Sequence, residues 1–478
     1  MSFAGFRFPT GKKDFSETVF GDGNARFYDA TFGEGDVSFY GATFGEGDVS
    51  FSAAKFGDGN VNFYRATFGK GNVRFSDTAF GNGWVSFHGA TFGDGEVDFH
   101  GAAFGEGNVS FFGATFGDGD VSFDYATFGE GDVSFEGATF GVGAVSFIDA
   151  IFDAGSISFR GTIFGKGVIT FADAISGKGS LIFDDASFKE NSIVFRNADI
   201  NGHLRLQNCR NTKTLRILSF RALRLTGTFI LEGNFTCVPD LRSTVMAAHV
   251  DLETSFIYPP RYKRRFPAFA FPRPATRHTA QLRRLKELAE QNCHHEAALR
   301  FFALERRDMR WTTSLSAWAS GLDWFYDMAC VYGQSVMRPA AVLVGLFAVF
   351  AGVYGLLDPC LGAWGALVKS AYYTVPFVFN KSARPATTVF RDPVHALTMA
   401  QQGFSFIFLF LLGVSLRNRF RLWGRACPPP FPPPRKRGGV PSHGKTPPAD
   451  RHRGRNSGQV PGRFGKTPAP AGRPGGPR

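Results

Sequence analysis

The sequence has few cysteines and no closely spaced pair of them. Its 478 residues include six Cys, and no two of them form a C-x-x-C motif, so neither a zinc site nor a disulfide framework is predicted. No Ser/His/Asp, Cys/His or paired-carboxylate arrangement stands apart from the rest of the sequence. We therefore expect a protein that is not an enzyme and that has no cofactor and no metal site.

Positive charge is absent from a long part of the chain. Residues 75–159 contain 13 Asp+Glu and no Lys or Arg. Residues 1–200 carry 13 Lys+Arg and 27 Asp+Glu, residues 201–416 carry 25 and 13, and residues 417–478 carry 15 and one. An acidic front and a basic tail indicate a modular protein. A charged leader with an apolar core and a cleavage site is also absent, and we expect the N-terminus to stay in the cytoplasm.

A 12-residue repeat fills the first 200 residues. Phe recurs at every twelfth position from Phe3 to Phe195, and a second series from Phe8 to Phe188 is interrupted at Ser176 alone. The unit reads V-S-F-x-G-A-T-F-G-x-G-D, in which each Phe follows a Val or an Ala by two residues. This spacing places both apolar side chains on one face of a strand.

The repeat predicts a β-solenoid over residues 1–200. The two Phe of a unit lie five residues apart, so one straight strand cannot bury both, and the chain has to turn between them and again at G-x-G. Glycines such as Gly33, Gly35, Gly45 and Gly47 suit that corner because Gly tolerates a positive φ and close approach of the backbone. The expected core ladder comprises Phe27, Phe32, Phe39, Phe44, Phe51, Phe56, Phe63, Phe68, Phe75 and Phe80.

The units A-T-F-G-x and V-S-F-x-G resemble those of pentapeptide-repeat proteins, here joined with a two-residue insertion. The resemblance implies a four-sided, right-handed β-helix. Two repeats in one coil would make the coil four-sided, and one repeat alone would close a flattened coil. We favour the four-sided coil, because four Phe fill a square section more easily than two fill a slab. Residues 201–258 have looser spacing and predict irregular terminal coils and a cap.

A helical region is predicted after a Pro-rich linker at 259–275. Apolar spacing within residues 276–337 predicts an α-hairpin, interrupted near 292–295, and then a juxtamembrane segment. Cys293, His294 and His295 are conceivable metal ligands, but a polar turn between the helices is the better interpretation.

Two long apolar segments predict membrane-spanning helices within residues 338–421. Pro339–Leu357 and Ala396–Leu416 lack charge and are long enough to cross the hydrocarbon core, with buried helices of a globule as the alternative. Arg338 and Arg417 flank them, which predicts that both ends of this region are cytoplasmic. Between them, an apolar stretch broken by Lys369 and Pro376 is expected to be interfacial or re-entrant.

The segment Tyr332-Gly333-Gln334-Ser335, the preceding hairpin and the Arg-rich end of the second span resemble the C-terminal region of membrane-bound bacterial pentapeptide-repeat proteins. This resemblance implies a location in the inner membrane and leaves the activity undefined. Residues 422–478, rich in Pro, Arg and Gly, are predicted to be disordered. This tail and the basic juxtamembrane segment are expected to lie on anionic lipid headgroups.

Acidic residues recur at the Gly corners and predict ridges along the solenoid. Solvated turn residues, calcium ligands and a surface for a basic partner are the alternatives. We expect a membrane-anchored scaffold that binds an unidentified protein. A channel-like protein with a regulatory solenoid and a DNA-mimicking, topoisomerase-interacting solenoid are the competing hypotheses. The possible interaction ridge comprises Asp94, Glu106, Asp118, Asp120, Glu130 and Asp132.

Overall fold

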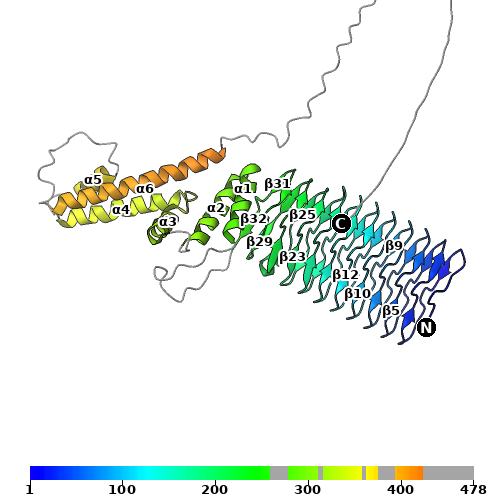
Figure 1. Ribbon diagram of the computed structural model, residues 1–478. Helices are drawn as coiled ribbons and strands as arrows, with labels where there is room; N and C mark the ends of the chain where they lie inside the picture. The colour runs from blue at the N-terminus through cyan, green and yellow to red at the C-terminus, as the bar shows by residue number, and fades with distance from the viewer. Residues whose placement is uncertain (259–277, 311–315, 358–361, 375–392, 424–478) are drawn as a thin grey trace, which may run out of the picture. The chain divides into compact units, whose positions relative to one another are not determined.

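The computed structural model describes residues 1–258, 278–310, 316–357, 362–374 and 393–423. Residues 13–257 form a parallel β-solenoid, and helices follow it (Figure 1). The predicted fold class is confirmed. The predicted Pro-rich linker at 259–275 and nearly all of the predicted disordered tail lie outside the described residues.

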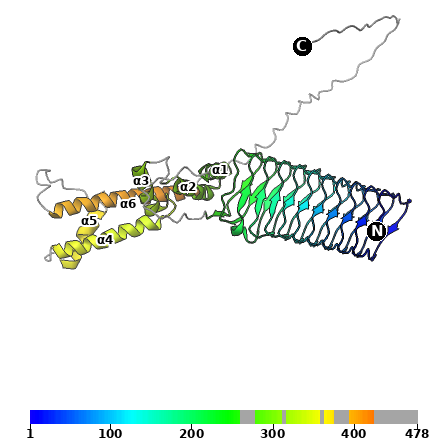
Figure 2. The ribbon, with the colours of Figure 1, turned by 60° about the horizontal axis from the view of Figure 1, so that its bottom comes forward.

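Each coil of the solenoid contains two repeats. The strand at Val37–Ser38 pairs in parallel with the strand at Val61–Asn62, and Val37 lies opposite Val61, its equivalent two repeats further on. The four-sided alternative is therefore the one that the structure shows. Figure 2 shows the coils stacked along one axis.

Two of the four sides are continuous sheets made of the V-S-F segments. Within residues 1–258, the larger contains β1 (Lys13–Asp14), β4 (Val37–Ser38), β7 (Val61–Asn62), β9 (Val85–Ser86), β11 (Val109–Ser110), β14 (Val133–Ser134), β17 (Ile157–Ser158), β21 (Leu181–Ile182), β25 (Leu204–Leu206), β28 (Phe229–Leu231) and β31 (Val250–Asp251). The other contains β2 (Ala25–Arg26), β5 (Val49–Ser50), β8 (Val73–Arg74), β10 (Val97–Asp98), β12 (Val121–Ser122), β15 (Val145–Ser146), β19 (Val168–Thr170), β23 (Ser192–Val194) and β26 (Ile217–Ser219).

The A-T-F segments form the remaining two sides, partly as strands and partly as isolated parallel bridges such as that between Thr43 and Thr67. One sheet contains β13 (Thr127–Phe128), β16 (Ile151–Phe152), β20 (Ile175–Ser176), β24 (Asp199–Ile200), β27 (Arg224–Leu225) and β30 (Val245–Met246). Shorter pairs are β3 (Thr31–Gly33) with β6 (Lys55–Phe56), β18 (Ile163–Phe164) with β22 (Ser187–Phe188), and β29 (Gly233–Phe235) with β32 (Ser255–Ile257).

Phenylalanine rings fill the interior. Each ring stacks on the ring one coil away, as Phe39 does on Phe63 with centroids 4.8 Å apart and planes within 1° of parallel. Rings from the two V-S-F sides meet edge to face, as Phe39 and Phe51 do at 5.4 Å and 81°. Both arrangements are favourable for aromatic pairs. The ten rings of the expected core ladder are all buried: Phe27, Phe32, Phe39, Phe44, Phe51, Phe56, Phe63, Phe68, Phe75 and Phe80.

Glycine serves the two kinds of corner for different reasons. The two-residue F-x-G corner needs a left-handed residue, as at Gly41 with φ 60° and Gly89 with φ 61°. The G-x-G corner needs close stacking, because a Cβ on Gly45 would lie 2.1 Å from the carbonyl oxygen of Gly21 one coil before. The expected positive φ is present at Gly33 and Gly35. For Gly45 and Gly47 that reason was wrong, and close approach alone explains the glycine.

The last coils are irregular and helices cover them. In the regular coils, paired residues are two 12-residue repeats apart. Here Leu181 pairs with Leu204, Leu204 with Phe229, and Phe229 with Val250, and none of these pairs keeps that spacing. A short 3-10 helix, η1 (Thr212–Thr214), interrupts one of these coils. Helix α1 (His278–Gln291) and helix α2 (His295–Met309) share the solenoid's hydrophobic core. The side-chain oxygen of Asn292 accepts a hydrogen bond from the backbone of Val250 at 2.9 Å.

The predicted hairpin is present, and its turn contains His294. The side chain of His294 lies 3.8 Å from Glu253 and 3.9 Å from Asp251 of the last coil. Helix α3 (Ala317–Cys330) follows and was not predicted.

Helix α4 (Met337–Leu357) and helix α6 (Pro393–Trp423) contain the two predicted long apolar segments, and they pack with α5 (Gly362–Thr374). Met337–Leu357 and Ala396–Asn418 are long and apolar enough to span a membrane, and in an apolar window of 18 residues in each only 22% is buried within the protein. That fraction is low for a core helix of a globule. Helix α5 is held by Gln401 of α6, whose amide donates to Ser370 and Thr374 and accepts from Tyr354.

Candidate functional site

The acidic corner residues form two ridges. Each coil has two G-x-G corners that lie diagonally opposite, because two V-S-F and two A-T-F segments alternate around it. Since successive repeats alternate between the two corners, three of the six predicted ridge residues fall on one corner and three on the other. Asp94, Asp118 and Asp120 share one ridge, and Glu106, Glu130 and Asp132 share the other.

The corner carboxylates also stabilise the coil. One oxygen of Asp120 accepts a hydrogen bond from the backbone N–H of Ala144 at 2.7 Å, and Asp132 accepts from Ser156 at the same distance. Asn108 performs the same task with its amide oxygen, at 2.8 Å from the backbone nitrogen of Asp132. Since an amide does this as well as a carboxylate, the hydrogen bond alone does not explain why so many corners carry a charge.

Within the part of the chain that the structure describes, no group of three or more His, Cys, Asp or Glu side chains is placed to hold a metal ion. The calcium hypothesis for the corners therefore has no ligand set there, and neither has the metal hypothesis for Cys293, His294 and His295.

An exposed aromatic row follows one F-x-G corner. Tyr40 stacks on Tyr64 with ring centroids 5.4 Å apart, Tyr64 lies 4.8 Å from His88, and His88 lies 4.9 Å from Phe112. Phe112 remains 45% exposed. The solenoid thus presents an aromatic row as well as two acidic ridges.

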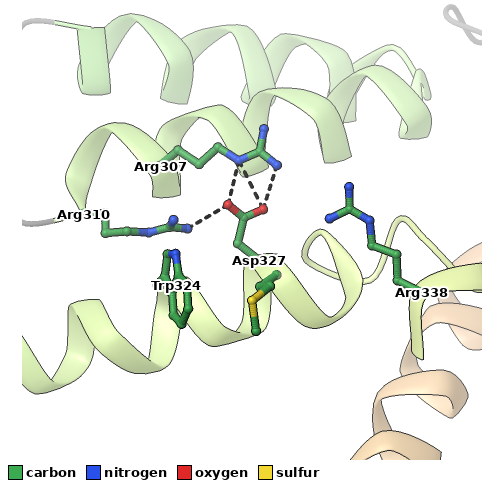
Figure 3. Close-up of a pocket in the computed structure, with 6 residues that line it drawn as sticks. Arg307, Arg310, Trp324, Asp327 and Arg338 are labelled. Carbon is green, nitrogen blue, oxygen red and sulfur yellow. Dashed lines mark hydrogen bonds and ion pairs between the residues drawn. The ribbon is translucent and has the colours of Figure 1, made fainter. Parts of the chain in front are cut away.

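A charged cluster joins α2 to α3. Arg307 donates from Nε and Nη2 to both carboxylate oxygens of Asp327, at 3.0 and 2.6 Å (Figure 3). Arg310 donates to Asp323 at 2.9 Å and to Asp327 at 3.1 Å. The hydroxyl of Tyr332 donates to Asp323 at 2.6 Å. Two acids on one face of α3 therefore hold the end of α2 through paired, charge-assisted hydrogen bonds.

Local sequence places this face of α3. The hydroxyl of Ser316 accepts the N–H of Ala319 at 3.2 Å and starts the helix. Val331, with φ 51°, ends it, and its N–H bonds the carbonyl of Asp327 at 2.9 Å. Asp323 and Asp327 stand four residues apart, which puts both on the side toward α2.

Burial and charge act against each other in the cluster. Burial by itself would raise the pKa of Asp327, but the hydrogen bonds from Arg307 and Arg310 outweigh it and lower that pKa. Burial raises the pKa of Tyr332, and its bond to Asp323 raises it further. Asp327 therefore stays ionised and Tyr332 neutral at pH 7.

A pocket of about 410 Å³ opens beside the cluster. Its lining includes Arg307 of α2, Arg310 directly after α2, Trp324 and Asp327 of α3, and Arg338 of α4 (Figure 3). Arg338 is exposed, and its guanidinium has no hydrogen-bond or ion-pair partner among the residues that the structure describes. The remaining wall is the exposed side chain of Met328.

The outer side of α3 is apolar and open. Sequence reasoning missed this helix, although two Asp on one side and large apolar residues on the other are the signature of an amphipathic helix. The exposed fractions are 78% for Trp318, 55% for Leu322, 50% for Trp324 and 53% for Met328.

No protein-family model matches the chain, and no curated protein matches it either.

Proposed function

We propose that the chain is a membrane-anchored repeat protein whose acidic solenoid is a protein-binding scaffold on the cytoplasmic side of a bacterial inner membrane. The solenoid, in this proposal, is of the pentapeptide-repeat type, with each pair of units lengthened by a two-residue insertion. Helices α4 and α6 are the two spans. Arg338 in the first turn of α4 and Arg417 near the end of α6 put both ends of this region in the cytoplasm by the positive-inside rule.

The charge on the corner ridges is the observation that supports scaffolding. Residues 75–159 hold 13 acids and no Lys or Arg. Their corner acids repeat at a fixed spacing on a backbone that each coil holds through hydrogen bonds to the next. A rigid row of one sign attracts a basic partner and loses little entropy when it binds.

The chain offers a variant that changes charge and keeps structure. Asn already accepts the corner hydrogen bond in both positions. Asn60, Asn72 and Asn108 stand where Asp120 and Asp132 do, and Asn82 stands where Asp94 and Asp118 do. Replacing the four Asp of the ridges with Asn and Glu106 and Glu130 with Gln therefore removes six charges and leaves the coil intact. A control variant removes six charges at the F-x-G corners instead, at Glu17, Asp29, Asp77, Asp149, Asp173 and Asp185.

The test compares proteins cross-linked in cells to the full chain and to both variants, after capture from detergent-solubilised membranes. We expect at least one basic partner that the ridge variant loses and the control variant keeps. Equal partner sets for all three proteins would refute binding by the ridges. Release of the full chain from membranes by alkaline carbonate would refute the anchoring.

A further inference from the structure

We propose that the pocket between α2, α3 and α4 binds the phosphate of an anionic phospholipid, with α3 lying in the headgroup layer beside the membrane. This inference rests on the proposed membrane anchoring and assigns a ligand to the pocket beside the start of the first proposed span. It does not depend on whether the solenoid is a scaffold.

The cluster has more positive charge than its own acids neutralise. Three guanidinium groups meet two carboxylates there, because Arg306 lies 3.7 Å from Asp323 while Arg307 and Arg310 bond to Asp323 and Asp327. A fourth, that of Arg338, pairs with neither acid and lines the pocket beside them. The formal excess is two positive charges. A singly charged phosphodiester with two free oxygens can accept from the guanidinium groups that line the pocket, and Arg pairs with phosphate in a fork geometry.

Arg307 and Arg310 are already positioned for such a ligand. Each uses Nε and Nη2 on the Asp pair, and neither Nη1 takes part in those bonds. Arg310 is almost wholly buried, so its side chain is ordered before any ligand arrives. Arg338, which lines the pocket from the start of α4, supplies a third donor group.

The surroundings favour a lipid over a soluble phosphate. Trp324 and Met328 form apolar walls of the pocket and are half exposed. Trp318 and Leu322 add further exposed apolar surface on α3, and α3 packs against both proposed spans, α4 and α6. Tryptophan is enriched at the headgroup level of membrane proteins. A soluble anion would gain nothing from these side chains, whereas a lipid would cover them.

The experiment uses the full chain, delipidated in detergent and then offered an equimolar mixture of phosphatidylglycerol and phosphatidylcholine. Native mass spectrometry counts the lipids that remain bound. We expect phosphatidylglycerol to be retained in preference to phosphatidylcholine. The variant Arg338→Gln should weaken that retention about 10-fold, because a charge-assisted contact is lost.

Arg417→Gln is the matched control. Arg417 is also exposed and also lies at the end of a proposed span, but it does not line the pocket. We expect Arg417→Gln to change the retention of phosphatidylglycerol less than 2-fold. Arg338→Lys should restore part of the preference for phosphatidylglycerol that Arg338→Gln loses. If Arg338→Gln and Arg417→Gln reduce the retention of phosphatidylglycerol equally, diffuse surface charge explains the retention and the proposed lipid site in the pocket is wrong.

Two further arms separate the possible sources of the phosphate. The two competitors are 10 mM inorganic phosphate and water-soluble dihexanoyl phosphatidylglycerol. If both displace the bound lipid equally, the site binds soluble anions and the lipid assignment is wrong. Carbonate extraction reports on membrane anchoring separately. A chain that stays in the membrane but shows no lipid preference would overturn this inference and leave the proposed function standing.

Discussion

Replacing Gly141 with Ala should break the stacking of two coils at one corner. The N–H of Gly141 donates to the carbonyl oxygen of Gly117 at 3.1 Å, and a Cβ on Gly141 would lie 2.1 Å from that same oxygen. Because this oxygen belongs to the backbone, no rotation of a side chain can relieve the clash, so the two coils have to separate locally and the hydrogen bond is lost. Overpacking of about 2 kcal/mol together with a hydrogen bond of about 1 kcal/mol gives roughly 3 kcal/mol of destabilisation.

Gly137→Ala is the matched substitution, four residues away on the same coil. Gly137 has φ 65°, and nothing lies within 4 Å of the position of its Cβ. The cost is that of a left-handed alanine, about 1 kcal/mol. The natural chain already has an alanine in this conformation at Ala53, with φ 55°.

Hydrogen exchange of the full chain, read on peptides that cover residues 133–148, measures the difference. Each 1.36 kcal/mol corresponds to a factor of ten, so exchange should accelerate by about 100-fold for Gly141→Ala and about 5-fold for Gly137→Ala. The refuting result is equal acceleration by the two substitutions, because it would mean that close stacking is not what selects glycine at the G-x-G corner.

Three further predictions concern other parts of the chain. Phe111→Ala should destabilise the solenoid by about 3–5 kcal/mol because the ring is fully buried in the ladder, whereas Phe112→Ala, at a half-exposed ring, should cost less than about 1 kcal/mol; denaturant unfolding distinguishes them. Burial raises the pKa of Cys209 to about 12 and that of Cys237 to about 11, although both side chains are only partly buried, so both thiols should be alkylated much more slowly at pH 7.5 in the folded than in the unfolded protein; equal labelling rates in the two states would contradict the raised pKa values. The pKa of Asp327 is lowered in the folded state, so the ionised carboxylate stabilises the α2–α3 junction above about pH 4, the unfolded value, and this stabilisation is lost as pH falls through the folded pKa. Amide hydrogen exchange in α3 should accelerate over that pH range. Asp327→Asn should remove that part of the pH dependence.

The solenoid could be predicted because its determinants are local and repeated. Each Phe and the small residue two before it define one side of a coil, and the number of rings needed to fill a square section gives two repeats per coil. The conformations of Gly45 and Gly47 could not be predicted from the local sequence. Glycine is required at these positions because the backbone of the preceding coil, two repeats earlier, lies too close for a Cβ. Likewise, the separation of Asp118 from Glu130 onto different corners follows only once the coil is closed.

The charged cluster depended on tertiary contacts that no sequence spacing reveals. Arg307 and Arg310 read as ordinary polar residues at the end of an amphipathic helix. Their role depends on Asp323 and Asp327, which lie beyond a break in the helical pattern and on a helix whose Gly and Ser weaken its periodicity. The signal available was the amphipathic pattern of α3, with Asp323 and Asp327 on one side and Trp318 among the large apolar residues on the other.

The coil built from two near-identical halves has a consequence for how this protein can evolve. Duplication or loss of one repeat adds or removes half a coil, which changes the length by about 2.4 Å, half of the usual strand spacing. It also turns everything on the far side of the change by half a revolution about the axis, which exchanges the two acidic ridges. Units gained in pairs restore the original orientation. The length of the acidic ridges can therefore change in small steps, while the side that each ridge faces alternates between two directions.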